Sequence, residues 1–221
     1  MRERTNGQFA SQAYHIEAME NGLRVVAPTS PVLSRGDTLN RPTITIEFLA
    51  VSPEVISVRA WHYEGYRTGE ARFEKKETTC DAVVTITENE AVLDAGRVSV
   101  HVDRKNWGYS FWADGKLLTS SGFHNLGYVR WDKRVSSMLP QDNYMKEHEY
   151  TPYMTQDLLL APGENVYGFG ERFTAFVKNG QAVETWNEDG GTASQVAYKN
   201  IPFYMTNRGY GVFVDHTGNV S

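Results

Sequence analysis

Apolar and polar residues alternate with a period of two along several stretches of this chain. The alternating stretches are residues 43–48, 55–61, 82–87 and 97–103. In the first of them, Ile44, Ile46 and Phe48 point to one side, and Glu47 lies on the opposite side. This pattern predicts strands with one face on a core and the other face in water. The many β-branched residues in these stretches also favour strands.

Turn signals separate these strand-like stretches at short intervals. An Asp-Gly pair at residues 114–115 lies between two such runs, and this pair tolerates the positive φ of a type I′ hairpin turn. A three-residue loop at 207–209 separates two further runs and predicts a second hairpin. Only residues 174–178 suggest a helical turn. Many short strands joined by frequent turns predict an all-β fold, an antiparallel β-sandwich.

Composition and charge narrow the possible partners. The 221 residues contain no repeat, linker or low-complexity tract, so we expect a single β-sandwich domain over residues 1–221. A net charge of -5, without a Lys/Arg cluster, argues against nucleic acid as a partner. The first residues contain no apolar core, and no apolar run approaches the ~20 residues that cross a bilayer, so we expect neither a signal peptide nor a membrane span. The one cysteine, Cys80, forms no intrachain disulfide, and we expect a cytoplasmic protein with no membrane partner.

Motifs for cofactors and metals are incomplete in this sequence. Residues 168–172 begin like a dinucleotide-binding loop, but Phe173 stands where that loop needs its third glycine. The six histidines lack the paired spacing of a zinc site, and His101 alternates with valines, which predicts a solvated histidine on a polar strand face. We therefore expect no cofactor and no metal.

Residues 166–214 carry the most informative chemistry. They contain the runs YGFGERF at 167–173, WNEDGG at 186–191 and YKNIPFY at 198–204. A loop that combines aromatic rings with carboxylates and amides suits a sugar, whose C–H face packs on a ring while its hydroxyls need paired acceptors. An Asx-rich turn without a ligand is the alternative that these residues leave open.

These three runs resemble the N-terminal domain of family 31 glycoside hydrolases, most of all its α-xylosidase branch. The resemblance implies a galactose mutarotase-like β-sandwich that precedes a catalytic (β/α)₈ barrel. It further implies a parent enzyme that hydrolyses terminal α-linked xylose or glucose with retention, using two carboxylates about 5–5.5 Å apart. Because both carboxylates belong to the barrel, we expect residues 1–221 to be an N-terminal fragment with no catalytic residues and no activity alone.

The resemblance also assigns site residues. Asp189 matches the aspartate of a loop that reaches over the barrel mouth, where its carboxylate would accept hydrogen bonds from sugar hydroxyls. Trp186 and Tyr198 are weaker candidates for the wall of the same pocket. Glu188 departs from the family, which usually has a basic residue there. Glu171 and Arg172 are expected to form a structural pair.

The expected partners are a carbohydrate with a terminal α-xylosyl or α-glucosyl unit and the missing barrel. An exposed apolar face for that barrel is also expected, through which the isolated domain would form a homo-oligomer. Two alternatives remain open at this point. One is a self-sufficient, lectin-like sugar-binding sandwich. The other is a mutarotase, although no motif brings together the His and Glu that its chemistry needs.

Overall fold

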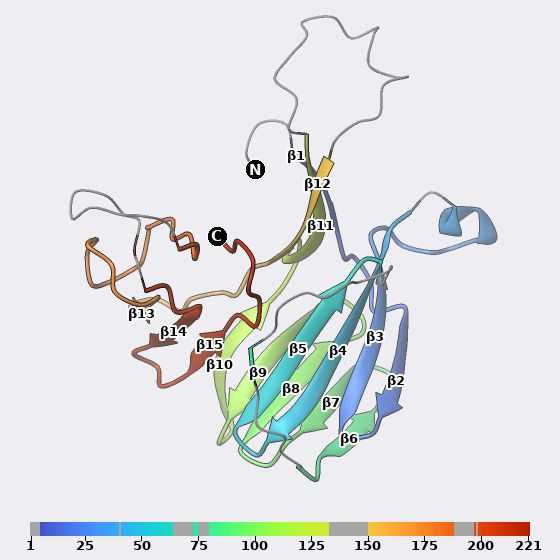
Figure 1. Cartoon of the computed structure of the whole chain (residues 1–221). Helices are drawn as coiled ribbons and strands as arrows, with labels where there is room; N and C mark the ends of the chain where they lie inside the picture. Colours follow the sequence, from blue (N-terminus) through green and yellow to red (C-terminus); the bar gives the residue numbers. More distant parts are fainter. Residues whose placement is uncertain are drawn as a thin grey trace, which may run out of the picture. The chain divides into compact units, whose positions relative to one another are not determined.

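The computed structural model describes residues 5–39, 41–63, 73–74, 80–132, 150–187, 197 and 199–221. The chain groups into two compact units (Figure 1). Unit 1 comprises residues 1–65 and 78–159, and unit 2 comprises residues 66–77 and 160–221. The expectation of a single domain over residues 1–221 stays a prediction.

Unit 1 is built from antiparallel sheets. The first has the strand order β2-β3-β4-β5, with β2 at His15–Met19, β3 at Gly22–Pro28, β4 at Thr43–Ser52 and β5 at Val55–Trp61. The second has the order β10-β9-β8-β7-β6, with β6 at Val83–Ile86, β7 at Glu90–Asp94, β8 at Val98–Asp103, β9 at Gly108–Ala113 and β10 at Lys116–Ser121. The third has the order β1-β11-β12, with β1 at Thr5–Phe9, β11 at Leu126–Asp132 and β12 at Tyr150–Gln156. A short 3-10 helix at Arg35–Thr38 precedes β4. The predicted all-β, antiparallel class is confirmed.

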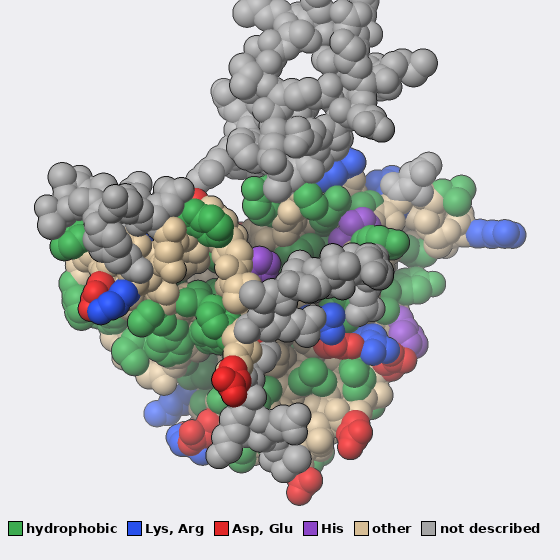
Figure 2. Space-filling model, viewed as in Figure 1, with side chains coloured by type: hydrophobic (Ala, Val, Ile, Leu, Met, Phe, Trp, Pro, Cys, Tyr) green, Lys and Arg blue, Asp and Glu red, His purple; other side chains and the backbone are tan. Residues whose placement is uncertain are grey.

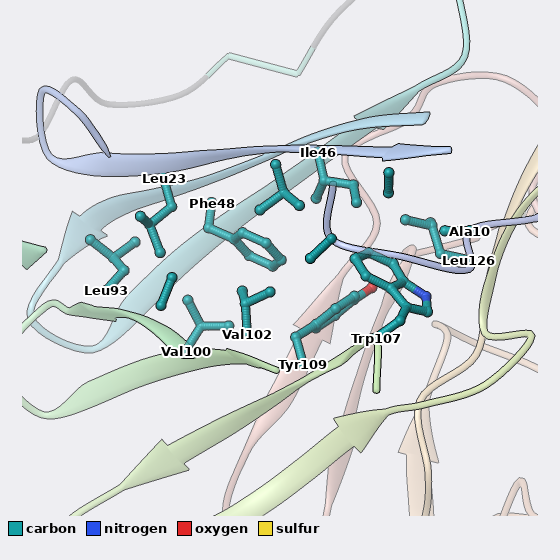
Figure 3. Close-up of a cluster of buried hydrophobic side chains, with 14 of the residues drawn as sticks. Ala10, Leu23, Ile46, Phe48, Leu93, Val100, Val102, Trp107, Tyr109 and Leu126 are labelled. Atoms are coloured by element: carbon teal, nitrogen blue, oxygen red, sulfur yellow. The ribbon is translucent and has the colours of Figure 1, made fainter. Parts of the chain in front are cut away.

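The core of unit 1 lies between the four-stranded and five-stranded sheets (Figure 3). Ile44, Ile46 and Phe48, which the alternation placed on one face, are all fully buried. The Phe48 ring meets the Tyr109 ring edge to face at 5.1 Å, and burial raises the pKa of Tyr109 to about 12. Aromatic and aliphatic side chains from both sheets thus close one sandwich core.

Both predicted hairpins are present. The turn between β9 and β10 has φ 49° at Asp114 and φ 74° at Gly115, the two positive angles that a type I′ turn requires. In the second hairpin, Phe203 pairs with Phe213 across the strands, and Gly209 has φ 85° in the three-residue loop.

The polar face of β4 differs from the expectation at Glu47. This residue is only 7% exposed, whereas the alternation placed it in water. Arg24, opposite it on β3, donates to Glu47 Oε1 from Nε at 3.0 Å and from Nη2 at 2.8 Å. The register continues this row to Glu17 on β2 and Arg59 on β5, so oppositely charged residues face one another across four strands. The hydrogen bonds that Arg24 donates to Glu47, followed by the one to Glu17, raise the pKa of Arg24.

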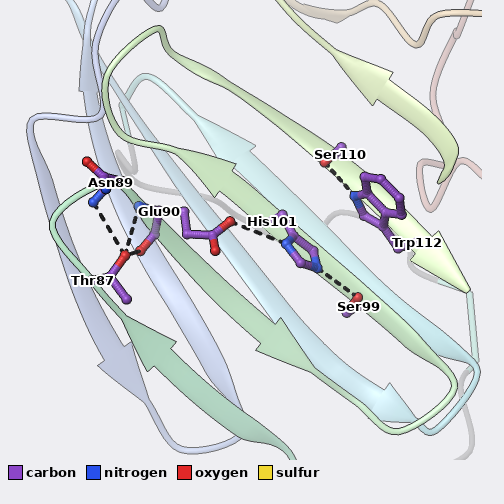
Figure 4. A network of polar contacts seen from close by, with 7 residues as sticks. All are labelled: Thr87, Asn89, Glu90, Ser99, His101, Ser110 and Trp112. Atoms are coloured by element: carbon purple, nitrogen blue, oxygen red, sulfur yellow. Dashed lines mark hydrogen bonds and ion pairs between the residues drawn. The ribbon is translucent and has the colours of Figure 1, made fainter. Parts of the chain in front are cut away.

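His101 lies on the polar face of the five-stranded sheet, as predicted (Figure 4). Its Nδ1 is 3.5 Å from Glu90 Oε2, and its Nε2 is 3.2 Å from Ser99 Oγ. The adjacent Trp112 donates from Nε1 to Ser110 Oγ at 2.8 Å. The polar atoms of these side chains therefore have partners within the network, which fits a structural role on the surface rather than a metal site.

Unit 2 contains a small antiparallel sheet of order β13-β14-β15, with β13 at Val166–Gly168, β14 at Phe203–Thr206 and β15 at Gly211–Phe213. The helical turn predicted at residues 174–178 is wrong. The backbone N–H of Lys178 instead donates to Val166 O on β13 at 2.8 Å. The Lys178 ammonium donates to Thr174 Oγ1 and to Ala175 O. The Ala175 carbonyl therefore accepts from a side chain rather than from a helical backbone N–H.

Among the described residues, no helix is long and apolar enough to cross a membrane. Cys80 is a free, buried thiol within the sandwich core. In the same part of the chain, no group of three or more His, Cys, Asp or Glu side chains gathers as metal ligands would.

A buried carboxylate, Glu164, joins two turns of unit 2. Its Oε2 accepts from the N–H of Ala161 at 2.8 Å and lies 4.0 Å from Arg208 Nη1 in the β14–β15 loop. Burial alone would raise the pKa of Glu164, but its polar interactions with Tyr210, Ala161 and Thr206 outweigh it and lower the pKa. The ionised carboxylate therefore stabilises the folded state.

We expect Glu164→Gln to destabilise the chain by about 1.5–3 kcal/mol at neutral pH, the usual range for hydrogen bonds to a charged group. Because the folded pKa is lowered, this stabilisation is present above the usual glutamate value of 4.5 and is lost as pH falls through the folded pKa. Urea unfolding at a series of pH values should therefore bring variant and parent together in acid. Glu171→Gln, which alters an exposed ion pair with Lys199, is the control and should change little. A constant gap across the pH series would contradict the assignment.

Candidate functional site

The glycines at residues 168–172 serve close backbone packing. Gly168, Phe169 and Gly170 have φ of 125°, 67° and 82°, three successive positive values that begin at the last residue of β13. A side chain at Gly168 would place its Cβ 2.6 Å from Phe203 O, and one at Gly170 would place it 2.1 Å from Lys199 O. The turn thus lies directly against residues 199–203, and no helix follows it within the described part of unit 2. A phosphate-cradling role has no support here.

Arg172 and Asn200 form a hydrogen-bonded hub that contacts the segment of Glu184 and Trp186. Arg172 donates from Nε to Phe169 O at 3.1 Å and from Nη2 to Glu184 O at 2.5 Å, and Nη2 also donates to Asn200 Oδ1. Burial lowers the pKa of the Arg172 guanidinium, partly offset by Glu184, yet an arginine keeps its charge. These are charge-assisted hydrogen bonds to groups from three segments of the chain.

Asn200 extends this hub to the segment that carries Trp186. Its Nδ2 donates to Trp186 O at 2.9 Å, to Asn187 Oδ1 at 2.7 Å and to Ala197 O at 2.8 Å. Bridges pair Thr185 with Val220 and Asn187 with Ala197 on either side. These contacts hold the backbone at residues 185–187 and at residue 197, on either side of residues 188–196.

The structure places one of the three predicted site residues. Trp186 is 45% exposed while its carbonyl is bound, so its indole is free to form a wall of a pocket. Asp189 and Tyr198, like Glu188, lie outside the described residues, and their roles stay predictions.

The sequence analysis did not predict how the runs at 167–173 and 198–204 are joined. It expected Glu171 and Arg172 to pair, but Glu171 Oε1 lies 3.3 Å from Lys199 Nζ, and Arg172 binds carbonyls and Asn200. The sequence did show an arginine in one run and an asparagine in the other, which could form a hydrogen bond. Arg172 and Asn200 are 28 residues apart, however, and no local pattern predicts a contact over that separation.

Unit 2 exposes many large apolar side chains. They are Leu160, Phe173, Phe176, Val177, Trp186, Ile201, Phe203, Met205 and Phe213, with Phe73 from its first segment. Alternation along β14 and the Phe203–Phe213 pairing put Phe203, Met205 and Phe213 on one face of the sheet. Figure 2 shows hydrophobic side chains gathered where Figure 1 draws this sheet. We call Phe203, Met205 and Phe213 the apolar face, and its role as a docking surface for a partner domain stays a prediction.

The sequence that forms this antiparallel fold, with its glycine turn and hub, matches a known class of domain. The family described as the glycosyl hydrolase 31 N-terminal galactose mutarotase-like domain matches residues 44–221. The chain therefore belongs to this domain family, as the resemblance implied.

Relatives and solved structures agree with that assignment. The chain is 39% identical over 210 residues to the α-xylosidase XylQ of Lactiplantibacillus pentosus, covering 93% of this chain and 25% of the relative. It is 37% identical over 196 residues to an α-xylosidase of Emericella nidulans, covering 85% and 25%. The cycloalternan-forming enzyme of Listeria monocytogenes, solved with a pentasaccharide, shares the fold with a TM-score of 0.68 at 16% identity, covering 95% of this chain and 18% of that one. The chain thus spans a quarter of the length of both α-xylosidases.

Proposed function

We propose that this chain is the N-terminal domain of a retaining α-glycosidase that removes terminal α-linked xylose. The observation that carries the proposal is its 39% identity to an α-xylosidase over 93% of the chain. Terminal α-linked glucose is the related substrate. The catalytic nucleophile and acid would lie on a following barrel, as the family resemblance implies.

The role of this chain in that enzyme is to bind substrate rather than to break the bond. The Arg172–Asn200 hub holds both ends of the loop, which presents the Trp186 indole and continues to Asp189. In the proposed arrangement, the indole packs on the sugar's C–H face, while the Asp189 carboxylate accepts hydrogen bonds from hydroxyl groups. This division gives the sugar one apolar wall and one charged acceptor.

The apolar face supplies a reason why the chain would work as part of a larger protein. Phe203, Met205 and Phe213 are exposed on consecutive strands, and burying them against a partner domain would be favourable. In the proposed enzyme, the barrel covers this face. In the isolated chain, the same face would promote self-association.

The proposal is tested by assaying 4-nitrophenyl α-D-xyloside and 4-nitrophenyl α-D-glucoside. We expect the isolated 221-residue chain to release no nitrophenol from either compound, because the proposal places both catalytic carboxylates on the following barrel. The longer natural protein should release it from the xyloside faster than from the glucoside.

Circular dichroism of the isolated chain serves as the control, since an inactive but unfolded sample would be uninformative. Turnover by the folded chain alone would exclude a purely supporting role. A longer protein that cleaves neither glycoside would exclude the glycosidase assignment, and preference for the glucoside would correct the substrate.

A further inference from the structure

A cavity of about 440 Å³ lies in unit 1, and no described residue of the loop that carries Trp186 lines it. It is lined by Gly7, Gln8, Phe9, Ser11, Thr29, Arg41, Phe123 and His124. Its volume falls within the range of small-molecule sites. Its lining combines two phenyl rings with an imidazole, a guanidinium, an amide and two hydroxyls, and includes no carboxylate.

The strand register builds an aromatic stack at this cavity. Phe9 on β1 pairs with Gly127 on β11, and a Cβ on Gly127 would lie 2.7 Å from the Phe9 ring. The ring of Phe9 therefore lies over the glycine, in the space that a side chain would occupy. From there it meets the His124 imidazole with centroids 5.0 Å apart. His124 in turn stacks on Phe123 at 3.8 Å and an interplanar angle of 20°.

The stack ends in an unusually exposed ring. Phe123 is 80% exposed, although a large apolar side chain with packing available would usually be buried. Its neighbour His124 has φ 59°, a left-handed conformation that costs energy in a residue other than glycine. The turn thus holds the Phe123 ring flat against the imidazole, with its outer side open to solvent.

Polar side chains of Gln8, Ser11, Thr29 and Arg41 line the same cavity. Thr29 Oγ1 lies 3.2 Å from Gln8 Oε1 and 3.0 Å from Pro42 O, so the Thr29 hydroxyl holds one end of the Gln8 amide while the other end can bind a ligand. Ser11 Oγ donates to Pro28 O at 3.0 Å and retains its capacity to accept. Arg41 adds a cationic donor at the exposed rim.

We propose that this cavity is a second saccharide-binding subsite, in which a pyranose ring stacks on the outer side of Phe123. The ring's C–H face would cover the phenyl group, while hydroxyls at its edge bind the Gln8 amide and the Arg41 guanidinium. This subsite would hold a distal part of an oligosaccharide without taking part in bond cleavage. It does not depend on the proposed glycosidase activity, because no residue of the Trp186 loop contributes to it.

The subsite is tested by titrating the ¹⁵N-labelled 221-residue chain with isomaltotriose at up to tens of millimolar and recording amide shifts by NMR. We expect shifts concentrated at Gly7, Gln8 and the turn of Phe123 and His124. Phe123→Ala should weaken binding at least about fivefold, because it removes the stacking surface. Arg41→Ala should weaken it less.

Tyr63→Ala is the matched control, since Tyr63 is an equally exposed aromatic residue of the same unit at 81% exposure. It should bind as the parent does, and sorbitol, which has hydroxyls but no ring, should produce no localised shifts. Three results would overturn the proposal: no shifts at these amides, equal weakening by Phe123→Ala and Tyr63→Ala, or a change in oligomeric state with Phe123→Ala. The last would mark Phe123 as part of a contact between copies of the chain.

Discussion

Gly170→Ala should cost unit 2 about 3 kcal/mol or more, enough to unfold a marginal domain. The new Cβ would lie 2.1 Å from Lys199 O and 2.9 Å from Ile201 N, both backbone atoms that cannot rotate away. The positive φ of 82° adds strain for any residue with a side chain. Urea unfolding followed by tryptophan fluorescence would measure the loss.

Gly180→Ala separates the two causes in that experiment. Gly180 has a similar φ of 74°, but a Cβ there meets nothing within 4 Å. We expect this control to cost only about 1–2 kcal/mol, the penalty for a left-handed alanine. If both variants lost the same stability, the close approach of residues 168–172 to residues 199–203 would not be what requires glycine.

Asp189→Ala in the full-length enzyme should lower kcat/KM for an α-xyloside by about 10–150-fold. That range corresponds to the loss of a charged hydrogen bond worth ~1.5–3 kcal/mol. Asp189→Asn keeps the size and one acceptor oxygen, so it should fall between parent and alanine variant. The measurement is steady-state hydrolysis of 4-nitrophenyl α-D-xyloside at several concentrations.

Glu171→Ala is the control for that series, because it also removes a negative charge from unit 2 but from an exposed ion pair with Lys199. It should leave kcat/KM close to that of the parent enzyme. Unchanged kinetics for Asp189→Ala would remove Asp189 from the substrate site. An equal loss in both variants would indicate a general effect of charge.

The sequence was most informative where structure is decided locally. Alternation around Ile46 identified β4 and its buried face, and the Asp114-Gly115 pair identified a hairpin together with its turn type. Both signals depend on neighbours a few residues away, and the pleat of a strand converts them directly into geometry.

Features decided by distant partners could not be predicted in this way. Glu47 was assigned to water because its pairing with Arg24 depends on the register of β3 and β4, not on its own neighbours. The helical turn predicted at residues 174–178 does not form, because the backbone N–H of Lys178 donates to an acceptor on β13. For the candidate site, the loop and its family were recognisable, whereas the Arg172–Asn200 hub required the folded chain.

The row of charges across β2 to β5 also bears on how the sheet selects one pairing among several. A slip of two residues between β3 and β4 would keep every apolar side chain on the correct face, so hydrophobic burial alone discriminates weakly against it. Such a slip would move Arg24 from Glu47 to Thr45 or Leu49 and break both hydrogen bonds from Arg24 to this buried carboxylate. The row of charges therefore helps to select the native register, because it destabilises shifted pairings that hydrophobic burial alone would tolerate.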